Sequence, residues 1–341
     1  MSEAHRETPR LPYRPRRLMP LVLFLLTVAS TIYVGRMQFQ VPEIIVDPTT
    51  GQKLPHVIVD VANRTFQVVY DRRQSWLNGL VYSLAVLTML GAHELGHYLQ
   101  TRRYRVPASL PIFIPMPFSP IGTMGAVISQ QGGVADRKAM FDIAISGPLA
   151  GLVVAIPLNW WGIAHSRIGP ILPGATGYSN PLIVEWMVGW ILRPLQPGED
   201  IALNPILFAG WVGIFITALN LIPVGQLDGG HILYCLIGKR AHHVARALFF
   251  GSLGFMIFQV VQGNNDYLGW SLILTLVGIS GLRHPPTSDD RVPLGLPRIV
   301  LGWLTLAFIF VGFVSVPFYE GEKPNPPAEQ TTPATDQKPS P

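Results

Sequence analysis

Residues 76–99 read WLNGLVYSLAVLTMLGAHELGHYL, an apolar run with no charged side chain before Glu94. The run is long enough to cross a bilayer, for which a helix needs about 20 residues. Ionisable side chains at membrane depth are costly, and they are rare there unless they have a function. His93 and His97 are four residues apart and share one helix face, so both can face one metal ion. Glu94 lies beside them, within reach of a proton. We therefore predict a zinc site inside a membrane.

The composition indicates a polytopic membrane protein. The chain has 341 residues, of which 49% are hydrophobic and only 13% charged, against about 25% charged in soluble proteins. The net charge of +5 lies largely in short basic clusters beside apolar runs. This distribution does not indicate nucleic-acid binding. Such clusters usually mark the cytoplasmic side of a membrane. A single cysteine, Cys235, excludes an intramolecular disulfide and a cysteine-rich zinc site.

Seven apolar segments predict an all-α fold with about six to seven transmembrane helices. They cover residues 18–34, 77–100, 139–160, 205–223, 245–261, 267–282 and 299–316. The fifth and sixth are short and are separated only by the sequence GNND, so we expect a tight antiparallel pair. The first segment has a cleaved signal peptide as its alternative reading, but its apolar stretch continues past the small residues at 29 and 30, which favours an uncleaved anchor.

The domain organisation follows from these segments. We expect a disordered basic N-terminus at 1–17, an anchor at 18–35, an extracytoplasmic connection at 36–75, a core at 76–240, further transmembrane helices at 241–318 and a disordered Pro-rich tail at 319–341. Within the connection, residues 56–70 alternate like a small β-hairpin around an Asn-Arg turn. Residues 181–192 are too short to span and are either an interfacial helix or an ordinary loop helix.

The basic clusters also predict an orientation. If the basic N-terminus is cytoplasmic, the second segment runs inward and ends at Arg102, Arg103 and Arg105, as the positive-inside rule requires. The fourth segment then runs the same way. His97 lies about three residues, or ~5 Å of helix, from the inner end of its segment. We therefore expect the site to be nearer the cytoplasmic side.

A third metal ligand is predicted from depth along the two parallel segments. The interval from Asn78 to His93 equals that from Pro205 to Asn220, about 15 residues or ~22 Å of helix, so Asn220 should lie level with His93. Pro223 and Gly225 then interrupt the helix, and irregular backbone at membrane depth is tolerated only when it is buried in protein or lines a wet cavity.

Asp228 follows this break, and we predict it to be the third ligand. A helix N-cap is the alternative reading for Asp228. For Asn220 the alternative is a hydrogen bond between helices.

These residues together resemble the site-2 protease family of intramembrane zinc metalloproteases. The resemblance rests on the spacing of the His-Glu-x-x-His and Asn-x-x-Pro-x-x-x-Leu-Asp-Gly motifs and covers residues 78–237. It implies that His93, His97 and Asp228 bind one Zn²⁺ per chain, that Glu94 activates water and that Asn220 helps to hold substrate. Many members have Asn-Pro-x-Pro where this chain has Leu after the Asn. The interval between the motifs is too short for a PDZ domain, so the chain resembles a PDZ-free branch.

Two further segments flank the predicted site. Residues 107–131 are apolar but contain too many prolines for a helix, so we expect membrane-associated β-strands between the second and third spans; a surface loop is the alternative. The resemblance implies the same sheet, whose edge can hold an extended substrate by strand addition. Gly147 and Gly151 are read as helix-packing residues. His231 is read as a capping or backbone-bonded histidine in preference to one that supports a metal ligand, and His284 has no predicted partner.

The predicted function is hydrolysis of peptide bonds within or near transmembrane segments of membrane proteins. The expected partners are such a substrate and the lipid bilayer, with no nucleic acid, and the expected location is a bacterial plasma membrane; the sequence leaves the oligomeric state open. A membrane metal transporter is one alternative, although apolar spans without polar groups on both sides of the site speak against it. A catalytically inactive relative and a prenyl-protein protease, whose third ligand is a glutamate, are the others.

Overall fold

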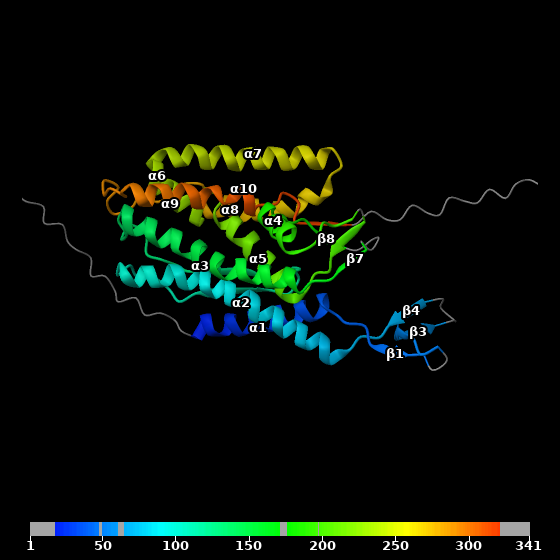
Figure 1. The fold of residues 1–341 in the computed structure, drawn as a ribbon. Coiled ribbons are helices and arrows are strands. Elements are labelled where there is room, and N and C mark those ends of the chain that lie inside the picture. Colours follow the sequence, from blue (N-terminus) through cyan, green and yellow to red (C-terminus); the bar gives the residue numbers. More distant parts are fainter. Residues whose placement is uncertain (1–17, 48–49, 61–64, 171–175, 197, 321–341) are drawn as a thin grey trace, which may run out of the picture.

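The computed structural model describes residues 18–47, 50–60, 65–170, 176–196 and 198–320. Most of these residues are helical, and the longer helices lie roughly side by side in a layered bundle (Figure 1). The small β-hairpins β1–β4 extend from one end of that bundle (Figure 1). The segments predicted to be disordered, 1–17 and nearly all of 319–341, lie outside the described residues, except that residues 319–320 belong to strand β10.

The helices of the described residues are α1 (Leu18–Gln38), α2 (Arg72–Arg103), α3 (Arg137–Ala164), α4 (Leu182–Ile191), α5 (Pro205–Asn220), α6 (Asp228–Ile237), α7 (Ala241–Val261), α8 (Trp270–Ser280), α9 (Leu296–Ala307) and α10 (Ile309–Gly312). Short 3₁₀ turns, η1 (Gly238–Arg240) and η2 (Asn265–Gly269), precede α7 and α8. The strands are β1 (Ile44–Val46), β2 (Lys53–Pro55), β3 (Val57–Asp60), β4 (Thr65–Val68), β5 (Ile112–Met116), β6 (Gly122–Val127), β7 (Ile168–Pro170), β8 (Thr176–Tyr178), β9 (Glu199–Ile201) and β10 (Phe318–Glu320).

Helices α2, α3 and α5 form the centre of the bundle. Most side chains of α5 are buried, which agrees with its nearly uniform apolar sequence. Small residues allow close approach: a Cβ on Gly162 would lie 2.5 Å from the Cα of Leu207, and one on Gly210 would lie 2.7 Å from the backbone nitrogen of Asn159. The backbones of α3 and α5 are therefore in direct contact, as is common where helices pack within a membrane.

The number of predicted spans is only partly matched. Among the described residues, four helical segments are long and apolar enough to cross a membrane: Leu18–Gln38, Arg72–Arg103, Arg137–Ala164 and the continuous stretch Asp228–Val261. Helix α5 and the stretch Leu296–Gly312 are apolar but shorter. The predicted span at 267–282 is a 3₁₀ turn followed by only 11 residues of α8, or ~16 Å of helix. Gly281, with φ at +90°, ends that helix.

The two predicted β elements are present. Strands β3 and β4 pair antiparallel with Val57 opposite Val68, and the turn between them lies outside the described residues. Strands β5 and β6, from the proline-rich segment, pair antiparallel with a register shift between Phe113 and Pro115. This second hairpin packs on α1, where Ser30 Oγ donates a hydrogen bond to the Gly122 carbonyl at 2.6 Å. Helix α1 thus contacts both the hairpin and α2.

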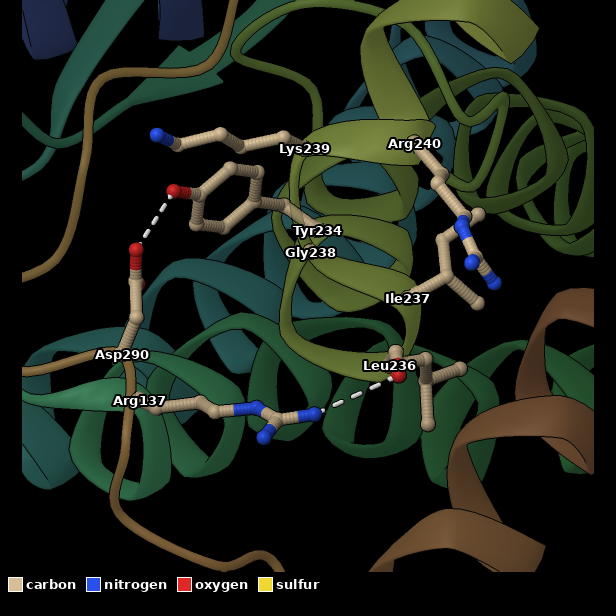
Figure 2. A pocket seen from close by; sticks show the side chains of 8 residues that line it. All are labelled: Arg137, Tyr234, Leu236, Ile237, Gly238, Lys239, Arg240 and Asp290. Atoms are coloured by element: carbon tan, nitrogen blue, oxygen red, sulfur yellow. Dashed lines mark hydrogen bonds between the residues drawn. The ribbon is translucent and has the colours of Figure 1, made fainter.

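The carboxyl end of α6 borders a hollow of about 500 Å³, which Figure 2 shows from close by. Arg137, at the start of α3, donates from Nε to the Cys235 carbonyl at 2.6 Å and from its terminal nitrogen to the Leu236 carbonyl at 3.3 Å. Tyr234 donates to the Asp290 carboxylate at 2.9 Å across the same hollow. The last carbonyl groups of a helix have no partner within it, so Arg137 caps α6 and ties it to α3.

We expect Arg137→Leu to lower the free energy of unfolding by about 1–3 kcal/mol, because hydrogen bonds from a charged donor to the α6 carbonyls are lost. Thermal unfolding in detergent measures the change. Arg240 lines the same hollow, but its side chain makes no hydrogen bond or ion pair with the described residues, so Arg240→Leu is the matched control. Equal melting temperatures for the two variants would show that the cap on α6 has no stabilising role.

Candidate metal centre

The His-Glu-x-x-His motif lies on α2, one continuous helix of 32 residues. Asp71 caps its start by accepting a hydrogen bond from the Gln74 backbone nitrogen. The residues His93, Glu94 and His97 are all buried or nearly so, with exposed fractions of 2%, 4% and 9%. One turn separates the two imidazoles, and their Nε2 atoms lie 3.2 Å apart. Both rings therefore point to the same place.

The break after α5 brings Asp228 to these rings. Helix α5 ends at Asn220, and the chain turns through Gly225 at φ +57° before α6 begins at Asp228. A Cβ on Gly229 would lie 1.8 Å from the Leu221 carbonyl oxygen, so only glycine permits this fold-back. Leu227 occupies the N-cap position of α6 and makes no side-chain cap. The alternative reading of Asp228 as the N-cap residue is therefore wrong.

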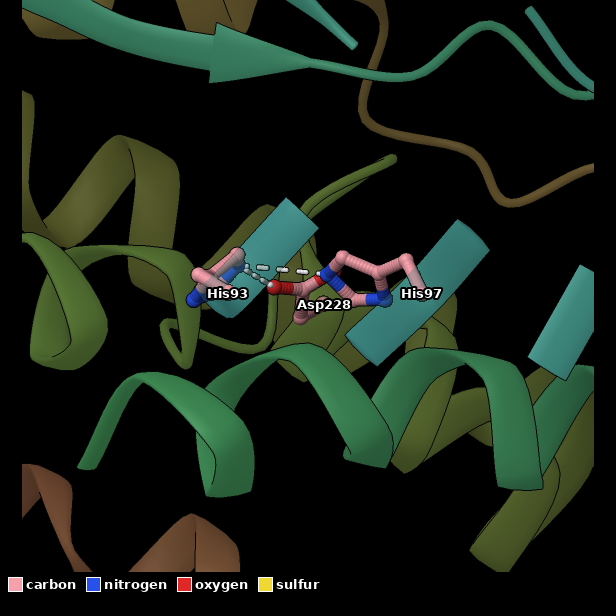
Figure 3. A group of neighbouring side chains, drawn as sticks. All are labelled: His93, His97 and Asp228. Atoms are coloured by element: carbon pink, nitrogen blue, oxygen red, sulfur yellow. Dashed lines mark hydrogen bonds and ion pairs between the residues drawn. The ribbon is translucent and has the colours of Figure 1, made fainter. Parts of the chain in front are cut away.

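The carboxylate of Asp228 contacts both imidazoles, although Asp228 follows His93 by 135 residues in the sequence (Figure 3). Its Oδ2 lies 3.2 Å from His93 Nε2, and its Oδ1 lies 3.3 Å from His97 Nε2. One ligand atom from each of the three side chains lies within 4.8 Å of the other two. The structure thus brings together the three residues that the sequence predicts as ligands.

The spacing and chemistry of these donors fit a small tetrahedral cation. Bond lengths of about 2.0–2.1 Å from zinc to nitrogen place tetrahedral ligands about 3.3 Å from one another, which matches the separations of 3.2 and 3.3 Å found here. His97 Nδ1 donates to the Ile143 carbonyl at 2.8 Å, so the Nε2 of a neutral His97 carries a lone pair. That lone pair faces a carboxylate, and a cation between them removes the repulsion. Two imidazoles and one carboxylate are a ligand set found in zinc hydrolases.

The backbone of α3 fixes the position of His97. Besides the hydrogen bond to Ile143, a Cβ on Gly147 would lie only 2.0 Å from His97 Nε2. Gly96 meets the same helix, since its Cβ would lie 2.5 Å from the Ser146 carbonyl oxygen. The sequence predicts Gly147 as a helix-packing residue, which is correct, but it does not show that the helix packs against a predicted ligand. A backbone carbonyl such as that of Ile143 leaves no signal in sequence at all.

Asn220 and Glu94 complete the surroundings. Asn220 Nδ2 lies 3.4 Å from His93 Nε2, so the two residues are level, as counting along the spans predicts. This contact joins α5 to α2, and the alternative of a hydrogen bond between helices therefore stays open beside a substrate contact. The carboxylate of Glu94 accepts no hydrogen bond from the part of the chain that the structure describes, which leaves it available to a water or a substrate.

A pair of histidines, one of them on α6, was not predicted. His231 Nδ1 and His284 Nε2 form a hydrogen bond, and the ring of His284 stacks on Tyr234 with centroids 4.3 Å apart. Burial lowers the pKa of His284 to about 3, so this ring stays neutral. His284 therefore has a partner that no sequence pattern indicates. The pair joins the segment after α8 to the helix that begins at Asp228.

Comparison with known proteins agrees with this site. Residues 81–258 match the model of peptidase family M50. The chain is 30% identical over 177 residues to "Probable zinc metalloprotease EGY2, chloroplastic" of Arabidopsis thaliana, covering 50% of this chain and 31% of that protein. It is 28% identical over 323 residues to "Probable zinc metalloprotease EGY1, chloroplastic" of the same plant, covering 88% of this chain and 53% of that protein.

The chain thus spans about a third to a half of the length of these curated relatives. No solved structure matches it significantly. The family model covers more than half of the chain, including both motifs and the break between α5 and α6. The chain therefore belongs to peptidase family M50, the site-2 protease family.

Proposed function

We propose that this protein is an intramembrane zinc metalloendopeptidase that cuts peptide bonds within or near transmembrane segments of other membrane proteins. The observation that carries the proposal is the convergence of His93, His97 and Asp228 on one point, with Glu94 beside them. All four lie on helical segments apolar and long enough to cross a membrane. The assignment of the site to a glutamate-ligand prenyl protease has no support in this arrangement, because an aspartate contacts both imidazoles.

The residues divide the chemistry between binding and proton transfer. His93, His97 and Asp228 would hold Zn²⁺, which when bound lowers the pKa of water and polarises a carbonyl group. Glu94 would take the proton from the attacking water and deliver it to the leaving amine, a general acid–base role. Because Glu94 is buried, bulk water does not compete for the proton that Glu94 would take from the attacking water. Asn220 would hold the substrate next to His93, as the resemblance implies.

The substrate would bind in extended form. Carbonyl groups within a helix are already hydrogen-bonded, so a transmembrane substrate must unwind before water can attack it. The hairpin of β5 and β6 lies in the segment between α2 and α3 and offers strand edges for pairing. Pro115 in β5 lacks an N–H donor, so β6 is the better edge. The expected partners are the substrate and the lipid bilayer.

The location follows from the family and the apolar helices, which place the protein in a membrane. The named relatives are chloroplastic, and for this chain we propose a bacterial plasma membrane, with Arg102 and Arg103 at the cytoplasmic end of α2. Water would then reach the site from the cytoplasm. A total of six spans requires that α5 and the stretch Leu296–Gly312 also cross, with the bilayer thinned around them or the helices flanked by interfacial residues. A seventh span would require α8 to cross as well.

Comparative proteomics of membrane fractions tests the function. Cells with the active protein should accumulate fragments of membrane proteins cut near a transmembrane segment, and cells with Glu94→Gln should retain the intact substrates. Identical fragment sets would contradict the proposal. Metal flux into vesicles that survives Glu94→Gln would favour a transporter, and an inactive relative would show neither cutting nor flux.

A further inference from the structure

The two imidazoles of the metal centre differ in their support. His97 has a backbone carbonyl as the partner of its Nδ1, whereas His93 Nδ1 is buried and has no hydrogen-bond partner among the described residues. A histidine that binds metal through one ring nitrogen almost always donates the proton of the other to a fixed acceptor. His93 is 2% exposed, so bulk solvent does not supply an acceptor for its Nδ1–H group.

Thr217 on α5 is the second buried group without a partner. Its side chain is fully buried, and its Oγ1 makes no hydrogen bond with the described residues. Other threonines on the helices donate to a carbonyl three or four residues earlier, as seen at Thr27, Thr31, Thr88, Thr101 and Thr305. A buried hydroxyl left unpaired costs about 1–3 kcal/mol. Thr217 therefore gives up the usual bond to its own helix without a visible replacement.

Both groups face one place on α3. A Cβ on Gly151 would lie 3.2 Å from His93 Nδ1 and 3.5 Å from Thr217 Oγ1. One turn away, a Cβ on Gly213 would lie 2.8 Å from the Cβ of Ala155 and 2.9 Å from the Cγ of Met89. At the level of Gly213, α3 carries Ala155, whereas at the level of His93 it carries Gly151. The missing methyl group leaves space between an unpaired donor and an unpaired acceptor.

We propose that Thr217 is the positioning residue for His93, through one water lodged beside Gly151. The water accepts a hydrogen bond from the Nδ1–H group of His93 and donates one to Thr217 Oγ1, a buried bridge of a kind that proteins commonly hold. This fixes the tautomer in which His93 Nε2 is the metal-binding atom and orients the ring toward Asp228. The inference rests on the proposed zinc site and adds to it the group that orients the second imidazole.

Zinc affinity of purified full-length protein, measured in detergent against a chromophoric chelator, tests the inference. Thr217→Val keeps the shape but removes the hydroxyl, and it should weaken zinc binding by about 10–100-fold, as is typical when an outer partner of a ligand histidine is lost. Thr217→Ser keeps the hydroxyl and should stay within about threefold of the wild type. Thr305→Val is the matched control, because that threonine bonds only to its own helix.

A double-mutant cycle separates the bridge from mere packing. Gly151→Ala adds a methyl group that intrudes on the space of the water and should also weaken zinc binding, while the double variant with Thr217→Val should bind no more weakly than the worse single variant. The visible spectrum of the cobalt(II)-loaded protein should change in each single variant. Thermal unfolding checks that each variant folds. If Thr217→Val does not fold, the zinc affinity of Gly151→Ala tests the inference instead.

Wild-type zinc affinity in Thr217→Val would overturn the inference while leaving the zinc site intact. If Thr217→Val does not fold, wild-type zinc affinity in Gly151→Ala would do the same. Full additivity of the two changes would do the same, because the two residues would then act independently. A wild-type chain that binds no zinc would instead overturn the proposed function and this inference with it.

Discussion

Glu94→Gln should abolish cleavage while zinc remains bound. The amide has nearly the same shape as the carboxylate, but it cannot accept the proton of the attacking water. General acid–base groups contribute about 10²–10⁴-fold to rate, so the turnover of a reconstituted transmembrane substrate should fall by about that factor. Glu94 itself lies outside the group of three donors that converge, and for this reason zinc content should stay at the wild-type value.

The control for this variant is Glu185→Gln on α4, an exposed glutamate far along the chain from the motif. It should cut at the wild-type rate. Metal content by mass spectrometry and cleavage in proteoliposomes are measured on the same preparations. If Glu94→Gln cut at the wild-type rate with zinc bound, another group would have to move the proton.

Gly147→Ala should disrupt the metal centre from the neighbouring helix. The added methyl carbon would lie 2.0 Å from His97 Nε2 and 2.4 Å from two ring carbons, which no packed structure tolerates. Either the imidazole leaves its hydrogen bond to the Ile143 carbonyl or α3 moves away from α2. In both cases His97 loses its place beside Asp228, and zinc affinity should fall by about 100-fold or more, with a matching loss of cleavage.

The matched control is Gly91→Ala on α2, since a Cβ there meets nothing within 4 Å. It should leave zinc binding unchanged and slightly stabilise the helix, because glycine is a poorer helix former than alanine by about 1 kcal/mol. Zinc titration and thermal unfolding of both variants decide the comparison. Wild-type zinc affinity in Gly147→Ala would mean that α3 does not hold His97 in place.

The sequence predicts the relative positions of the site residues better than their environment. Counting helical rise along two parallel spans places Asn220 level with His93, and the structure has them 3.4 Å apart. The count succeeds because each span is an uninterrupted helix with a fixed rise per residue. The proline-rich segment is also predicted correctly as β5 and β6, since proline forbids a regular helix there.

Features that depend on tertiary contact are not predictable in this way. The segment that forms α8 is apolar enough to suggest a span, yet the turn η2 uses its first residues and leaves a short helix. The partner of His284 comes from α6, 53 residues away, and no local pattern marks it. Gly147, Gly151 and Thr217 have ordinary packing as their simplest explanation in sequence. Only the crossing of α2, α3 and α5 shows which of them face a ligand.

The zinc content of the purified chain tests most directly whether His93, His97 and Asp228 bind one zinc ion. The wild-type protein should retain one zinc per chain after dialysis. Asp228→Ala should lose it, because two imidazoles alone bind far more weakly than a complete set of three ligands, while the control Asp200→Ala at an exposed position should keep it. Asp228→Ala with one zinc per chain at wild-type affinity would contradict the account.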